Sequence, residues 1–245
     1  MQLYIIRHAQ SVNNALWART GNDIGRDPDP GLTDIGQTQA QHLADYLATH
    51  RAQTPADTWD PHNRLGYDFT HLYTSLMERA IATGHAIATA LDMPLLAWEA
   101  IHEWGGIYQD DPASGQRMGQ PGATGSYLAT HYPRLVANVG EEGWWNRPYE
   151  PREQAFLRAQ DVVRELWQRH GQTNDRVALV THGGFSFALY SALFGLTSPI
   201  ESVGQPMYTW FGTHNTSLSR LDFGPDNYNL MYLNRVDHLP ADLIT

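Results

Sequence analysis

Short apolar runs alternate along the chain with amphipathic segments, a pattern that predicts strands and helices in turn. The strand-like runs are residues 3–6, 69–74, 94–98 and 176–181, and a closing hairpin is predicted from 216–223 and 228–235. Helical spacing covers residues 33–50, 75–91, 152–170 and 184–194. Strands that alternate with helices favour an α/β fold, here a three-layer α/β/α sandwich around a mostly parallel central sheet.

Two local patterns refine the helices. In the helix predicted over 33–50, Leu32, Ile35, Leu43 and Leu47 fall near one face and predict its buried side. The sequence from Ser75 to Glu78 has the spacing of a capping box and predicts the start of the helix that runs to about Leu91.

Two stretches fit no regular element. Residues 51–67 are polar with scattered prolines and predict a surface insertion, while residues 105–151 are rich in Gly, Pro and aromatics. The second stretch is too long for an ordinary connection, so it is either a surface insertion or a cap that folds over a site beside it. We expect one domain over residues 1–245 that carries both insertions.

Composition excludes several classes of protein. The formal net charge of −10 argues against a nucleic-acid binder, and the chain has no Cys, which excludes disulfides and thiolate chemistry. All 16 basic residues are Arg, so a lysine Schiff base and a P-loop lysine are also excluded. There is no signal-peptide pattern and no apolar run of about 18 residues, so we expect a cytoplasmic protein without membrane contact. The oligomeric state stays open, a homo-oligomer included.

Charged and imidazole side chains follow four predicted strands. Arg7 and His8 end the first strand, Arg79 lies just after the second, Glu103 follows the third, and His182 ends the strand 176–181. Because ligands of open α/β sheets bind beyond the carboxyl ends of the strands, we expect these five groups to converge.

Their chemistry matches the cleavage of a phosphate ester. Arginines hold the non-bridging oxygens, a neutral imidazole is a competent nucleophile, and a carboxylic acid protonates the leaving oxygen. His8 suits the role of nucleophile and Glu103 that of acid, while a protonated His182 would add positive charge. No cofactor and no metal ion is required by this set, and its partner would be a small phosphorylated substrate.

These residues resemble the histidine phosphatase superfamily, also called phosphoglycerate mutase-like. The resemblance spans almost the whole chain, and its landmarks are Arg-His-Ala-Gln-Ser-Val-Asn-Asn at 7–14, Gly-Leu-Thr at 31–33, Tyr-Thr-Ser at 73–75 with Arg79-Ala80, Glu-Trp-Gly at 103–105, Thr-His-Gly-Gly at 181–184 and Asn-Thr-Ser at 215–217.

The resemblance implies roles for individual residues. His8 would be the phosphorylated nucleophile, with Arg7, Arg79 and His182 around the phosphate. Glu103 would be the proton donor. Further contacts with phosphate or substrate would come from Asn14, the backbone at Gly183, and the loop at Thr20 and Gly21.

The sequence departs from the family's pattern at three points, and the last two favour a phosphatase over a phosphoglycerate mutase (an isomerase), which stays the alternative. The family's usual Gly after Arg-His is Ala9 here, a mild change if its φ is negative. The acidic residue that the mutases commonly place next is Gln10, and the Lys-containing mutase insertion has no counterpart.

Three other functions would fit parts of the sequence. Residues 184–188 (Gly-Phe-Ser-Phe-Ala) loosely match a nucleophile elbow and would make Ser186 the nucleophile of a serine esterase. A metallohydrolase would use His8 and His182, but no familiar metal-ligand spacing is present. A non-catalytic phospholigand-binding module would keep the arginines without turnover.

Aromatic residues suggest a hypothesis about the substrate. Trp17, Trp104, Tyr108, Trp144 and Trp145 either pack in the core or line the mouth of the site. If several line the mouth, the pocket suits a bulky phosphate monoester, and Trp104 and Trp145 are the residues whose replacement would change substrate preference.

Overall fold

The computed structural model describes residues 1–52, 59–196 and 210–245. Its strands are β1 (Gln2–Arg7), β2 (His71–Thr74), β3 (Leu95–Ala97), β4 (Tyr108–Asp110), β5 (Arg117–Gly119), β6 (Leu135–Val136), β7 (Arg176–Thr181), β8 (Leu218–Phe223) and β9 (Tyr228–Arg235). Its α-helices are α1 (Val12–Thr20), α2 (Asp34–Thr49), α3 (Glu78–Leu91), α4 (Gly125–His131), α5 (Arg152–His170) and α6 (Gly183–Leu193). Two short 3₁₀ helices lie at Glu99–Ile101 and Ala241–Leu243.

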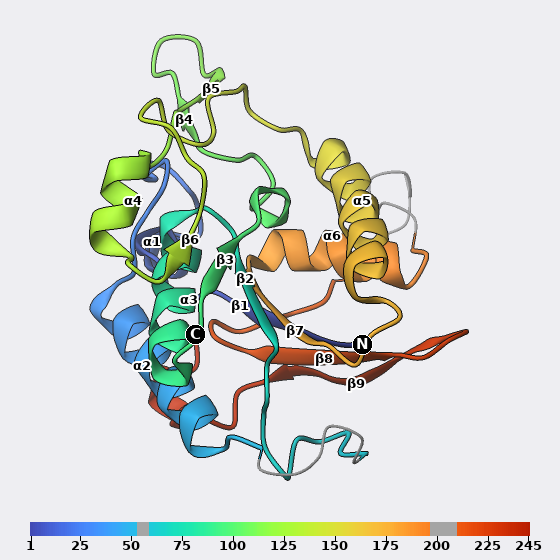
Figure 1. Cartoon of the computed structure of the whole chain (residues 1–245). Helices are drawn as coiled ribbons and strands as arrows, with labels where there is room; N and C mark the ends of the chain where they lie inside the picture. The colour runs from blue at the N-terminus through green and yellow to red at the C-terminus, as the bar shows by residue number, and fades with distance from the viewer. Residues whose placement is uncertain (53–58, 197–209) are drawn as a thin grey trace.

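The central sheet is mostly parallel, as predicted. Its strand order is β6-β3-β2-β7-β1-β8-β9, in which the first five strands run parallel and β8 runs antiparallel to both of its neighbours. Helices α2 and α3 cover one face and α5 and α6 the other (Figure 1). The molecule is therefore the three-layer α/β/α sandwich that the alternation of elements predicted.

Strand β1 shows how the sequence builds these layers. Leu3 and Ile5 belong to the apolar cluster beneath α5 and α6, whereas Tyr4 and Ile6 belong to the cluster beneath α2 and α3. Because successive side chains of a strand point to opposite faces, a continuous apolar run is what a strand covered on both faces requires. The same argument accounts for β7, whose residues from Val177 to Thr181 are all buried.

The predicted bounds of β7, β9 and α5 agree with the structure, but α1 was missed. None of its residues is buried, so it has no apolar face for a periodicity argument to detect. It is defined instead by its ends. Ser11 and Asn14 form a reciprocal capping box at its start, and Gly21 ends it with a φ of 70°.

Two details of the predicted helices were wrong. Ile35 is 44% exposed, and the buried face of α2 is formed mainly by Ala40, Leu43 and Leu47. Helix α3 begins at Glu78 without a side-chain cap, so the predicted capping box is absent. The hydroxyl of Ser75 instead forms a hydrogen bond with the Nε2 atom of His182, at 2.8 Å.

The stretch 105–151 is built into the core. It supplies the antiparallel pair β4–β5, helix α4, and the edge strand β6, which pairs parallel with β3. Ile107, Trp144 and Trp145 are buried in the cluster on the α2–α3 face. Gly106 lies under Trp145 with a φ of 70°, and an added Cβ would come within 1.9 Å of the indole ring.

The stretch 51–67 contains residues 53–58, which lie outside the described residues. Its flanks meet each other, since Ala52 donates its backbone N–H to the carbonyl of Tyr67 at 2.8 Å. Tyr67 is buried, and Asn63 donates to the Tyr4 hydroxyl at 2.9 Å, so this end of the stretch is attached to the sheet.

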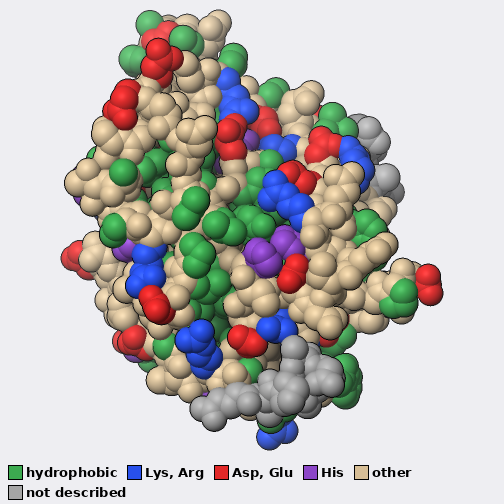
Figure 2. Space-filling view, in the orientation of Figure 1, with side chains coloured by type: hydrophobic (Ala, Val, Ile, Leu, Met, Phe, Trp, Pro, Cys, Tyr) green, Lys and Arg blue, Asp and Glu red, His purple; other side chains and the backbone are tan. Residues whose placement is uncertain are grey.

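Acidic and arginine side chains lie interspersed over the face drawn in Figure 2. Among the described residues, no helix combines the length and the apolarity that a membrane span needs.

We predict that Trp145→Ala destabilises the fold strongly while Trp17→Ala does not. The indole of Trp145 is 2% exposed, and truncating a buried aromatic residue costs roughly 3–5 kcal/mol. Trp17 is 59% exposed on α1, so the same substitution there should change the free energy of unfolding by less than about 0.5 kcal/mol. Urea unfolding of both variants measures the difference. Equal stabilities would mean that 105–151 does not contribute to the core.

Candidate active site

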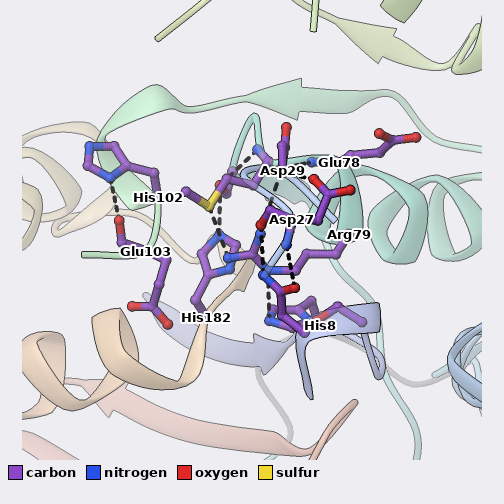
Figure 3. A network of polar contacts seen from close by, with 12 residues as sticks. His8, Asp27, Asp29, Glu78, Arg79, His102, Glu103 and His182 are labelled. Carbon is purple, nitrogen blue, oxygen red and sulfur yellow. Dashed lines mark hydrogen bonds and ion pairs between the residues drawn. The ribbon is translucent and has the colours of Figure 1, made fainter. Parts of the chain in front are cut away.

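The carboxyl ends of β1, β7 and β2 meet at one edge of the sheet. In the parallel registers Arg7 lies opposite Thr181, and Thr74 lies opposite Val180. His8 and His182 therefore leave adjacent strands side by side, with ring centroids 5.1 Å apart. Arg79, in the first turn of α3, reaches the same point from β2 (Figure 3).

The imidazole of His8 is held in one orientation. Its Nδ1 lies 2.7 Å from the carbonyl oxygen of Ala9, which can only accept, so Nδ1 carries the proton. Its Nε2 accepts a hydrogen bond from Nε of Arg79 at 3.2 Å. This tautomer leaves a lone pair on Nε2. Ala9 is absent from the positive-φ residues of the described chain, so alanine is tolerated where the family usually has glycine.

Both histidines are held in the neutral form. Burial, followed by the charges of Arg79 and Arg7, lowers the pKa of His8 well below its usual value. Burial, followed by Arg79 and His8, does the same to the pKa of His182. Ser75 contacts Nε2 of His182, and the Nδ1 atom of that ring has no hydrogen-bond partner among the described residues.

Arg79 rests on a buried carboxylate that the sequence analysis missed. Its Nη1 lies 3.7 Å from Oδ1 of Asp29, which also accepts the backbone N–H of Glu78 at 3.1 Å (Figure 3). Burial raises the pKa of Asp29 to about 7, against the opposing effect of Arg79. The only sequence signal was the Asp-Pro-Asp-Pro run at 27–30, which favours a turn and says nothing of its neighbours.

Arg7 approaches the same point from β1. One of its Nη atoms donates to the carbonyl oxygen of Thr213, while its Nε is buried without a partner in the described part of the chain. Gly183, the first residue of α6, lies beside it, and a Cβ there would be 3.3 Å from that Nε. Two guanidinium groups and a helix N-terminus thus surround His8, an arrangement suited to an anion.

Glu103 faces the start of α6. Its Oε1 accepts the backbone N–H of Trp104 and its Oε2 that of Gly184, both at 2.9 Å. A Cβ on Gly184 would lie 2.5 Å from Oε1, so this approach requires glycine. Arg158 donates to the carbonyl oxygens of Ala100 and His102 and so fixes the segment that leads to Glu103.

Asn14 lies beside the backbone of His8. Its Oδ1 accepts from the backbone and hydroxyl of Ser11, each at 3.1 Å, and from Nδ2 of Asn215 at 3.2 Å. The same Asn215 amide donates to the carbonyl oxygen of His8 at 2.8 Å. With its oxygen engaged, Asn14 offers its Nδ2 group as a donor to an anion.

A cavity of about 310 Å³ opens over these groups. Its lining comprises Arg7, His8, Ser11, Asn13, Asn14, Leu16, Trp17, Asp23, Arg26, Arg79, Glu103, Trp104, Gly183, Gly184, Trp210 and Thr213. The structure therefore brings together the predicted residues Arg7, His8, Asn14, Arg79, Glu103 and Gly183. His182, whose ring lies beside that of His8, is fully buried and is not among the lining residues.

Other predicted residues lie apart from the cavity. Thr20 and Gly21 end α1 on the surface and are not in the described lining, and the stretch 105–151 adds no residue to it either. Of the five aromatics, Trp17 and Trp104 line the cavity. Trp145 is a core residue, so its replacement would test folding and not substrate preference.

Arg26 is a further lining residue that was not predicted from the sequence. Its guanidinium lies 3.8 Å above the ring of Tyr108 and donates to the carbonyl oxygen of Tyr108 at 2.5 Å. Arg26 thereby adds a third positive charge to the lining. The loop that carries Arg26 follows no predicted strand, so its position in the sequence did not indicate that it lies at the site.

The alternative nucleophile is poorly placed. Ser186 is buried in the first turns of α6, and its hydroxyl has no partner among the described residues. A nucleophile elbow would present the serine at the turn between strand and helix, next to a base. The group of three metal-ligating side chains found in the described residues, His71, His170 and Asp175, lies away from this cavity.

A family model described as the histidine phosphatase superfamily (branch 1) matches residues 3–57 and 62–236. A search of the curated proteins finds no significant match.

Several solved structures share the fold. A mycobacterial glucosyl-3-phosphoglycerate phosphatase in complex with VO3 is 18% identical, with a TM-score of 0.56 over 96% of this chain and 99% of that one. A phosphoserine phosphatase from Entamoeba histolytica in complex with 3-phosphoglyceric acid is 16% identical, with a TM-score of 0.57 over 98% and 99% of the two chains. YhfR of Bacillus stearothermophilus is 19% identical, with a TM-score of 0.55 over 97% and 98%.

At these identities the structural likeness establishes the fold, and the family match, which covers most of the chain, establishes descent. The chain belongs to the histidine phosphatase superfamily.

Proposed function

We propose that this protein is a metal-independent phosphatase that hydrolyses small phosphate monoesters through a phosphohistidine on His8. The observation that carries the proposal is the unprotonated Nε2 of a buried, neutral imidazole at the base of a cavity lined by Arg7 and Arg79. A nucleophile surrounded by cations is suited to an electrophile that carries negative charge.

In the first step the lone pair of His8 Nε2 attacks phosphorus while the ester P–O bond breaks. The ring becomes cationic, and the hydrogen bond from Nδ1–H to Ala9 supports that charge. Arg79 moves its Nε–H from His8 to a phosphoryl oxygen. The protonated Glu103 carboxyl donates its proton to the leaving oxygen, so an alcohol departs.

In the second step Glu103, now a carboxylate, accepts a proton from water. The water oxygen bonds to phosphorus, the N–P bond breaks, and its electron pair returns to His8 Nε2. Inorganic phosphate leaves, and Glu103 is protonated again. The two backbone N–H groups that bind Glu103 keep the carboxyl group at one place through both steps.

His182 acts next to the phosphoryl group. When the Ser75 hydroxyl donates to Nε2 of His182, the proton of this neutral ring lies on Nδ1, the nitrogen left without a partner in the described chain. That N–H is a donor for a phosphoryl oxygen. A dianionic group beside the ring would also raise the pKa of His182, which burial and Arg79 hold low in the free protein.

The cavity supports a small phosphorylated compound as substrate. The phosphate would lie against His8 and Arg79, and the alcohol part would extend toward Trp17 and Trp104. Similar folds include phosphatases named for glucosyl-3-phosphoglycerate and for phosphoserine. These compounds are phosphate esters whose alcohol parts differ in size, which is consistent with a shared phosphate site beneath a variable mouth.

We predict that His8→Ala abolishes hydrolysis of p-nitrophenyl phosphate in excess EDTA. Loss of a covalent nucleophile lowers kcat by roughly 10³-fold or more. Wild type quenched after mixing with ³²P-labelled substrate should carry a label that survives alkali and is lost in acid, as expected for a phosphoramidate. His42→Ala, an exposed position on α2, is the matched control and should retain activity. Equal activity of wild type and His8→Ala would refute the proposal.

We predict that Glu103→Gln is sensitive to the leaving group. The amide cannot supply a proton, so hydrolysis of an alkyl phosphate should fall by roughly 10²–10⁴-fold. Cleavage of p-nitrophenyl phosphate should fall less in the first turnover, since p-nitrophenolate leaves unprotonated. Glu99→Gln, an exposed glutamate that pairs with Arg147, is the control. Stopped-flow kinetics with both substrates provides the test, and equal losses would assign Glu103 a role other than acid.

We predict that His8 keeps Nδ1 protonated and Nε2 unprotonated as the pH falls below 6.5, which is the usual pKa of a histidine side chain. Burial and two guanidinium charges disfavour the imidazolium, so protonation is deferred to lower pH. The unfolded chain takes up that proton near pH 6.5, so the stability that neutral His8 contributes is present above 6.5 and declines below it. Imidazole ¹⁵N NMR between pH 8 and 5 measures the pKa. Arg79→Met should raise the pKa of His8, and no change would leave burial and Arg7 as its causes.

A further inference from the structure

Three side chains with metal-ligating atoms gather at the amino-terminal edge of the sheet. They are His71, the first residue of β2, His170, the last residue of α5, and Asp175, the residue before β7. Their ligand atoms all lie within 4.8 Å of one another. Asp175 lies at the opposite end of β7 from His182, about 23 Å away at about 3.3 Å per residue. The cluster is therefore separate from the catalytic cavity.

The carboxylate of Asp175 lies between the two imidazoles. Its Oδ2 is 2.8 Å from Nδ1 of His170, and its Oδ1 is 3.9 Å from Nδ1 of His71. A tetrahedral zinc ion with bonds of about 2.0–2.1 Å places its ligand atoms about 3.3 Å apart. The observed separations bracket that value, so small side-chain rotations would complete the site.

A second contact fixes the buried ligand. Without a metal ion, Nδ1 of His170 donates to Oδ2 of Asp175 at 2.8 Å, and Nε2 accepts from the hydroxyl of Tyr73 at 3.2 Å. A zinc ion in place of the Nδ1 proton would move the ring proton to Nε2, which would then donate to Tyr73. Metal-bound histidines usually donate their other N–H to a group of this kind, which holds the tautomer and the ring orientation. Tyr73 therefore provides the outer contact that a metal site needs.

The exposure of the three side chains and the charges around them also suit a bound cation. The side chain of His170 is 5% exposed, whereas those of His71 and Asp175 are 34% and 24% exposed, so the cluster is anchored inside and open to solvent outside. The neighbouring cations have partners of their own. The Met1 ammonium donates to the carbonyl oxygen of Thr173, and Arg176 pairs with Asp68.

We propose that His71, His170 and Asp175 bind a zinc ion, with solvent completing the coordination. The two imidazoles and one carboxylate are ligands that zinc accepts. The ion would link β2, α5 and the start of β7, which are far apart in the sequence. Its role is to stabilise the fold, and it takes no part in the chemistry at His8.

The test is calorimetric titration of the untagged, EDTA-treated and dialysed protein with zinc sulfate. Wild type should bind one equivalent, and His71→Ala, at a half-buried position at the start of β2, should bind at least tenfold more weakly. Tyr73→Phe should weaken binding by roughly 10–100-fold, as for other outer contacts of metal sites. His131→Ala, an exposed histidine on α4, is the matched control and should bind as wild type does.

Two outcomes would overturn the proposal. If wild type shows no saturable binding, the cluster is a hydrogen-bonded chain from Asp175 through His170 to Tyr73 that needs no ion. If His71→Ala binds zinc as tightly as wild type, the ion lies elsewhere. Zinc should also raise the Tm of wild type and not that of His71→Ala. None of these readouts uses phosphatase activity, so the proposal stands or falls independently of the proposed function.

Discussion

The parallel pairing of β1 with β7 is the constraint on which the site depends. Its register sets Arg7 opposite Thr181 and so brings His8 next to His182. A shift by one residue would turn every side chain of β1 to the other face and separate the two rings. The continuous apolar runs of both strands resist such a shift, because Leu3 and Tyr4 would exchange the two clusters in which they are buried. The catalytic geometry is thus a consequence of core packing.

The positive charge of three arginines around the cavity is the second organising feature. Arg7, Arg79 and Arg26 face one cavity, and the buried carboxylate of Asp29 stands behind Arg79 on the side away from His8. Burial makes the charged forms of both histidines unfavourable, while the arginines keep their charge under all ordinary conditions. The protein thereby separates two functions: arginine attracts the anion, and imidazole remains free to react.

Much of this arrangement could be predicted from the sequence, since it follows local rules. Arg7, His8 and His182 leave apolar strands, and the carboxyl edge of a parallel sheet is where ligands bind. Asp29 and Asn215 could not be placed, because they reach the site from loops whose paths depend on tertiary packing. The capping spacing predicted that Ser75 caps a helix, but its hydroxyl forms a hydrogen bond with Nε2 of His182. Trp145 could not be assigned either, because the sequence does not distinguish an aromatic residue that lines a pocket from one that is buried in the core.

The position of β1 in the sheet has a consequence for synthesis. This strand is made first, yet its partners are residues 176–181 on one side and 218–222 on the other. Both of its edges stay unpaired until the ribosome has translated most of the chain, and the Asn215 amide that holds the backbone of His8 arrives at the same late stage. The pocket therefore cannot form in stages while the chain is being synthesised. The apolar strand β1 can pair wrongly throughout elongation, so chaperones or rapid folding of the finished chain must protect it.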